Sequence, residues 1–156
     1  MGDNAILNDI LRVGFSRSDF NVIDNPVMAA PYEVDHFFEV QHVVSLLLQN
    51  HLIDPNSWYG EQTGYFMDLA SFVNEHRNLY QISRAVNQAK KNIPLNQYRT
   101  NATITTYLAY RVMKGGQLVT VGSQVREMAT QMRTRKTPYA KLTKAVGERL
   151  CTVMGW

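Results

Sequence analysis

The stretch YEVDHFFEVQHV, residues 32–43, places Asp35 and His36 side by side in a run of mostly apolar residues. Both side chains are costly to remove from water, so a segment whose neighbours favour burial needs a reason to carry them. A neutral imidazole, with an ordinary pKa of about 6.5, can take a proton from water near pH 7. A carboxylate is a ligand for hard divalent cations. Taken alone, the pair is better explained as an ordinary surface turn or a polar pair that serves the fold, so any chemistry must be argued from its context.

A second polar group follows in NEHRNLYQISRAVNQAKKN, residues 74–92, where Asn78 and Leu79 precede Asn87. With residues 32–43, it resembles the HNH (His-Me finger, ββα-metal) endonuclease superfamily. That family carries a DH pair on one strand, an NL pair on a second strand, and an Asn or His on the following helix. The resemblance covers residues 33–92, and a basic residue often trails the helix position, as Lys90 does here.

The resemblance implies a role for each matched residue. His36 would be the general base, and Asp35 and Asn87 would hold one divalent cation, Mg²⁺ or Mn²⁺ rather than Zn²⁺ because its ligands are oxygen atoms. Asn78, counted with the catalytic residues, would brace the loop after the first strand, and its carbonyl would orient His36. Because neighbouring strand residues face opposite sides, we expect the strand to break into a loop at the DH pair.

The predicted activity is metal-dependent hydrolysis of DNA phosphodiester bonds with little sequence specificity, as in a toxin or effector module that has an inhibitor or immunity protein. Two alternatives are an RNase on the same scaffold and a noncatalytic nucleic-acid-binding or interaction module. The chain departs from many family members in two respects. It places 41 residues between His36 and Asn78, and it has Ser83 and Val86 where many members carry zinc-binding cysteines.

Other residues near the motif allow a functional and a structural interpretation. Glu39 could join the metal site or pair with an arginine, and His42 and His76 could be accessory ligands or ordinary structural histidines. Arg84, Lys90 and Lys91 surround Asn87 on the predicted helix, where they could contact nucleic-acid phosphates or form a solvated face. Four tyrosines among basic residues could stack on bases or pack in the core: Tyr98, Tyr107, Tyr110 and Tyr139.

Charge is divided unevenly along the chain. Residues 1–76 hold two basic and eleven acidic residues, a net charge of −9, whereas residues 77–156 hold fourteen basic and two acidic residues, a net charge of +12. Such a division is typical of contact with nucleic acid or another anionic surface. The alternative is that the two halves neutralise each other across an internal interface.

Composition predicts one ordinary domain over residues 1–156, since 45% of the residues are hydrophobic and 19% are charged. The single Cys151 excludes an internal disulfide and a multi-cysteine zinc site. We find neither a membrane-length apolar run nor a signal peptide. We therefore expect a soluble protein with no membrane partner, acting in the cytoplasm or nucleus.

The patterns predict an α+β, mainly helical fold: a ββα-metal core over residues 33–92, with helices before, within and after it, and a basic helical part over residues 95–156. Ile104, Tyr107, Leu108 and Val112 fit one helical face, and residues 114–117 fit a turn. The remaining expected strands cover residues 32–40 and 77–83, and the remaining expected helices cover residues 3–14, 41–52, 64–75, 84–92, 123–136 and 139–150.

Overall fold

The computed structural model describes residues 2–13, 15, 20–25, 28–53 and 63–156. Within them the fold is α+β and mainly helical, as predicted. Its helices are α1 (Gly2–Leu11), α2 (Val40–Gln49), α3 (Thr63–Val73), α4 (Arg84–Lys91), α5 (Ala102–Ala109), α6 (Val121–Arg133) and α7 (Lys141–Met154), with short 3-10 turns at His76–Asn78 and Leu95–Gln97. Its strands are β1 (Asn21–Val22), β2 (Tyr32–His36), β3 (Leu79–Ser83), β4 (Arg111–Lys114) and β5 (Gln117–Thr120).

The three-stranded sheet brings together the two segments that carry the motif. Its strand order is β1-β3-β2, with β2 antiparallel to β3 and β1 parallel to it. Asp35 lies opposite Tyr80, and His36 lies opposite Leu79. Helix α4 begins directly after β3, and the hydroxyl of Ser83 caps it by accepting a hydrogen bond from the backbone N–H of Val86 at 3.3 Å. In chain order these elements are β2, the helices α2 and α3, then β3 and α4.

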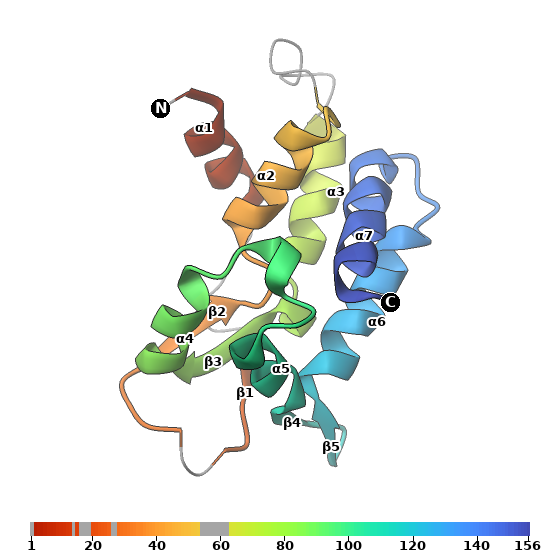
Figure 1. The fold of residues 1–156 in the computed structure, drawn as a ribbon. Coiled ribbons are helices and arrows are strands. Elements are labelled where there is room, and N and C mark those ends of the chain that lie inside the picture. The colour runs from red at the N-terminus through yellow and green to blue at the C-terminus, as the bar shows by residue number, and fades with distance from the viewer. Residues whose placement is uncertain (1, 14, 16–19, 26–27, 54–62) are drawn as a thin grey trace.

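The residues between β2 and β3 form a separate helical layer. Helices α2 and α3 pack with α1 and α7 on one side of the molecule, while the sheet, α4 and α5 lie at the other end (Figure 1). Buried apolar side chains from both parts join in one core cluster. The helices α2 and α3, which lie between β2 and β3 in the chain, therefore extend the core and leave the pairing of β2 with β3 intact.

The second half differs from the prediction between α5 and α6. Val112 does not continue the helical face of Ile104 and Tyr107, because α5 ends at Ala109 and Val112 lies in β4. The β4 and β5 strands form a hairpin that the sequence analysis missed. Gly115 and Gly116 close it with φ angles of 55° and 82°, the left-handed conformation that two-residue hairpin turns favour.

The other predicted elements are present with shifted ends. The strand expected over residues 32–40 ends at His36, and α2 begins at Val40. Helix α1 covers Gly2–Leu11, whereas residues 3–14 were expected, and residue 14 lies outside the described residues.

Helices α6 and α7 pack closely because Gly147 has no side chain. A Cβ atom at this position would lie 2.5 Å from the backbone nitrogen of Arg133 and 2.7 Å from Cβ of Met132. We expect Gly147→Ala to lower the free energy of unfolding by about 1–3 kcal/mol through overpacking, measured by urea denaturation. Lys144→Ala, on the exposed side of the same helix, should stay within about 0.5 kcal/mol, and equal effects would contradict the tight contact.

Candidate functional site

Asp35 and His36 both lie in the paired part of β2, so their side chains leave the sheet on opposite faces. The expectation that the strand breaks at this pair is wrong. The break comes at Phe37, whose backbone N–H donates to the carbonyl of Asn78 at 2.8 Å. Asp35 therefore meets α4 and α5, whereas His36 meets the C-terminal end of α3.

On the first face, the ammonium of Lys90 lies at the centre of a buried cluster. Its Nζ atom is 3.1 Å from Oδ2 of Asp35, 2.7 Å from Oε1 of Glu39 and 3.0 Å from the carbonyl oxygen of His36. Lys90 has no exposed surface, and Asp35 has 4%. An ammonium has three donors, so these oxygens satisfy all of them.

Aromatic side chains enclose the same ammonium. The ring centres of Phe37, Tyr98 and Tyr107 lie 5.7, 5.7 and 5.9 Å from Nζ of Lys90, within the range of cation-π attraction. The hydroxyl of Tyr107 also donates to Oδ2 of Asp35 at 3.0 Å. The cluster is therefore a closed polar network inside an aromatic shell.

Two carboxyl groups share one ammonium in this network. Burial raises the pKa of Asp35 to about 7, although Lys90 opposes the rise. Burial also acts to lower the pKa of Lys90, but the attraction of Asp35, Tyr98 and Glu39 outweighs it, and the net pKa lies above the ordinary value. Lys90 thus stays charged, and the two carboxyl groups compete for its one ammonium.

On the second face, His36 is tied to the helical layer. Its Nε2 atom is 2.9 Å from Oδ1 of Asn74, whose amide nitrogen donates to the carbonyl of Leu11 at 2.7 Å. The ring of Phe15 packs on the imidazole at 4.9 Å. Nε2 must carry the proton to donate to an amide oxygen, so only Nδ1 could act as a base. Burial lowers the pKa of His36, which keeps it neutral.

Asn78 lies where the resemblance implies a bracing residue, and it is fully buried. Its side chain accepts from the backbone N–H of Phe38 at 2.9 Å and donates to the carbonyls of Phe38 and Val73 at 3.2 and 2.8 Å. It thus fixes the chain just after β2. The carbonyl of Asn78 accepts from the backbone N–H of Phe37, and the side chain of Asn74 is the group that bonds to the imidazole of His36.

Asn87 and Asp35 have different partners. The side chain of Asn87 donates to Oε2 of Glu33 at 2.5 Å, and Glu33 also accepts from Nε of Arg84 at 2.9 Å. The hydrogen bonds from Asn87 and Arg84 lower the pKa of Glu33. Helix α4 therefore lies along one face of β2, with Asn87 near Glu33 and Lys90 near Asp35.

A divalent cation does not fit this arrangement. The oxygens of Asp35 and Glu39 that could bind it already surround the ammonium of Lys90, and a dication there would repel that charge. Asn87 contributes to a different pair. Across the described parts of the chain, no group of three or more His, Cys, Asp or Glu side chains could hold a metal ion.

The accessory candidates are spread around the cluster. Glu39 pairs with Lys90. His42 packs edge-on against Tyr98 at 5.5 Å, burial lowers its pKa, and its Nδ1 atom has no hydrogen-bond partner among the described residues. His76 lies in the 3-10 turn before β3, where its carbonyl accepts from Asn21 at 2.7 Å.

The three basic residues of α4 differ in whether they face solvent or the interior. Arg84 and Lys91 are exposed, and Arg84 pairs with Glu33. The prediction that Lys90 contacts phosphate is wrong for this structure, because Lys90 points inward and is fully buried. Lysine can bury its charge only with such partners, and here Asp35 and Glu39 supply them.

Sequence reasoning did not identify Asn74 as the partner of His36 or Tyr107 as the partner of Asp35. Both occur in apolar helical segments, where a single Asn or Tyr is common. The available signal was weak: Asn74 is a polar residue directly after the apolar run SFV, and Tyr107 lies on the buried face of α5.

Comparisons with protein-family models, with curated proteins and with solved structures each found no match to this chain. The functional argument therefore depends on the geometry and charge described above. Among the described helices, none is long and apolar enough to cross a membrane.

The first test of the site concerns the buried ammonium. We expect Lys90→Met to lower the free energy of unfolding by about 3–5 kcal/mol near neutral pH, because it leaves the buried Asp35 and the partly exposed Glu39 without a cation. Urea denaturation measures the loss. Lys91→Met, one residue away and exposed, is the matched control and should change stability by about 0.5 kcal/mol or less. Similar losses in both variants would contradict the role of Lys90.

The second test concerns His36, whose pKa is lowered on folding. The neutral ring stabilises the fold above its ordinary pKa of 6.5, and this stability is lost as the pH falls below 6.5 toward the lowered pKa. We expect the free energy of unfolding of the parent minus that of His36→Gln to decrease between about pH 7.5 and about pH 5. Taking this difference removes the contributions of Asp35 and His42, which titrate in both proteins. If the free energies of unfolding of the parent and of His36→Gln ran parallel with pH, the assignment to His36 would be contradicted.

Proposed function

We propose that this protein binds nucleic acid through exposed basic side chains of its second half, with Asp35 and His36 serving the fold. The supporting observation is where the charges lie. From residue 77 onward, eight exposed basic residues accompany only two exposed acidic ones, Glu127 and Glu148. The exposed basic residues are Arg84, Lys91, Arg99, Arg111, Arg126, Lys136, Lys141 and Lys144.

The acidic residues of the first half are partly used inside the molecule. Lys90 pairs with Asp35 and Glu39, and Arg135 pairs with Asp68 at 2.7 Å. Lys90 and Arg135 of the second half thus pair with three acidic side chains of the first half. That pairing removes acidic charge from the surface and leaves most basic charge exposed, which favours an anionic partner.

A nucleic-acid backbone fits such a surface better than an isolated anion would. Each contact between a basic side chain and a phosphate releases condensed counterions, so many dispersed contacts add up to substantial affinity. Such binding needs no enclosed pocket. It would be largely independent of sequence, which agrees with the expectation of little sequence specificity.

A metal-dependent HNH-type endonuclease, acting on DNA or RNA, is the second candidate. One observation favours it: β2 pairs with β3, from which α4 follows directly, Asp35 and His36 lie opposite Tyr80 and Leu79, and Asn78 holds the chain just after β2. Catalysis would require Lys90 to leave Asp35 and His36 to leave Asn74. The toxin or effector role, with its inhibitor or immunity partner, belongs to this candidate.

One pair of measurements separates the two candidates. Fluorescence anisotropy with labelled oligonucleotides measures binding, and incubation of plasmid DNA and of RNA with Mg²⁺, Mn²⁺ or EDTA measures cleavage. Binding without cleavage supports the binding module. Cleavage that EDTA abolishes, and that a folded His36→Ala variant lacks, would replace it with the endonuclease.

The dependence of affinity on salt tests the basic surface directly. Charge reversal at Lys91 and Arg111 should weaken binding to all sequences alike. It should flatten the slope of log K against log salt by roughly 0.7–0.9 per lost phosphate contact. Asp9→Asn, an exposed change in the acidic half, should leave the slope unchanged. A parent affinity that does not respond to salt would contradict the proposed function.

A further inference from the structure

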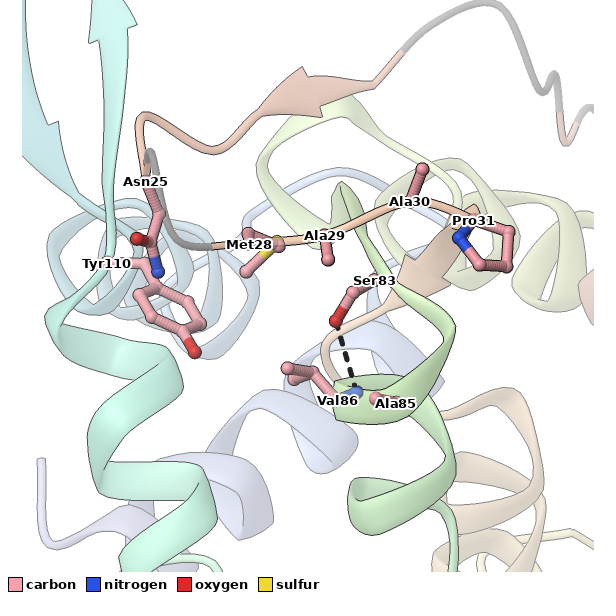
Figure 2. Close-up of a pocket in the computed structure, with 9 residues that line it drawn as sticks. All are labelled: Asn25, Met28, Ala29, Ala30, Pro31, Ser83, Ala85, Val86 and Tyr110. Atoms are coloured by element: carbon pink, nitrogen blue, oxygen red, sulfur yellow. Dashed lines mark hydrogen bonds between the residues drawn. The ribbon is translucent and has the colours of Figure 1, made fainter.

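A groove lies between α4, the end of α5 and the segment before β2. Two cavities of about 330 and about 400 Å³ share Ala85, Val86 and Tyr110, so they adjoin each other. Figure 2 shows the first, with Tyr110 and Asn25 on one side and α4 on the other. Both volumes lie in the range of small-molecule sites, about 300–1,000 Å³.

The groove has apolar walls with a few polar groups. Methyl groups of Ala85, Ala89 and Ala102 line the groove. Met28, Ala29 and Ala30, from the segment before β2, extend it (Figure 2). Thr103 and Thr106 of α5 add hydroxyl groups to the second cavity. A flat, largely apolar ligand with hydrogen-bonding edges suits these walls.

Tyr110 is the aromatic side chain common to both cavities. Its ring packs on that of Tyr107 at 5.9 Å, and the hydroxyl of Tyr107 is held by Asp35. Of the tyrosines that could stack on bases, Tyr98 and Tyr107 are fully buried, whereas Tyr110 is half-buried. The groove therefore contains an aromatic ring that is anchored to the core.

Exposed cations adjoin the lining residues in sequence. Arg84 directly precedes Ala85, Lys91 ends α4, and Arg111 directly follows Tyr110. Two acidic residues lie nearby: Asp24, which is exposed, and Glu33, which pairs with Arg84. The residues that line the two cavities are themselves uncharged, so contacts to phosphate would come from charged side chains outside the groove.

We propose that this groove binds an unpaired base of a single-stranded nucleic acid, with the base against Tyr110 and the neighbouring phosphates contacted by exposed basic side chains outside the groove. The inference rests on the proposed function and makes it more specific. Stacking on an aromatic ring together with contacts to cations is how sequence-tolerant single-strand binding works. In a duplex the bases are paired and stacked, so the groove adds nothing to duplex binding.

The test compares single-stranded DNA, single-stranded RNA and a DNA duplex of the same sequence and length, by anisotropy at one salt concentration. The parent should bind one or both single strands more tightly than the duplex. Equal affinity for all three would overturn the groove and leave nucleic-acid binding standing. No binding to any of them would overturn the proposed function itself.

Variants locate the effect. Tyr110→Ala should weaken single-strand binding by roughly 5- to 150-fold and leave duplex binding unchanged, while Tyr110→Phe keeps the ring and should match the parent. Tyr139→Ala is the matched control, since this tyrosine is 55% exposed and packs on Tyr65 of α3. Equal effects of Tyr110→Ala and Tyr139→Ala would overturn the proposal.

A second variant tests the groove independently in case Tyr110→Ala does not fold. Ala85 is exposed and lines both cavities, so Ala85→Trp can fill the groove without disturbing the core. It should lower single-strand affinity and spare duplex affinity. A folded Ala85→Trp variant with parental affinity for single strands would overturn the proposal.

Discussion

The burial of one ammonium group organises the part of the molecule that carries the motif. Lys90 can be fully buried only because Asp35, Glu39 and the carbonyl of His36 surround its Nζ atom. Those oxygens come from β2 and from the chain that follows it, so the ion pair fixes α4 against the sheet. The rings of Tyr98 and Tyr107 extend the same contact to the residues after α4 and to α5.

The two members of the Asp35 and His36 pair thereby join different parts of the fold. Asp35 links the sheet to α4 and α5, and His36 links it to α3 and, through Asn74, to the end of α1. A regular strand makes this division necessary, because it sends neighbouring side chains to opposite faces. The polar pair inside an apolar run thus has a structural reason that requires no catalysis.

Sequence reasoning predicted the elements better than the partners of their side chains. Apolar spacing and caps gave the helices, and the DH and NL pairs correctly indicated which strands lie together. It missed the β4 and β5 hairpin because Val112 also suits a helical face. It misjudged Lys90 because a basic residue on a polar helix is ordinarily exposed, and only the distances to Asp35 and Glu39 reveal an inward orientation. Long-range pairs such as His36 with Asn74 leave no local signal.

The buried ammonium of Lys90 also bears on whether Asp35 can bind a metal ion. A carboxylate that helps to hold a metal ion must keep oxygens free for it, whereas Asp35 gives Oδ2 to both Lys90 and Tyr107. In this structure the position beside Asp35 is held by the ammonium of Lys90. The same network fixes Tyr107, on which Tyr110 packs. The buried network around Lys90 thus supports the packing of Tyr110 at the surface groove. Its ion pairs also use acidic side chains of the first half, which leaves most of the exposed charge of the second half positive.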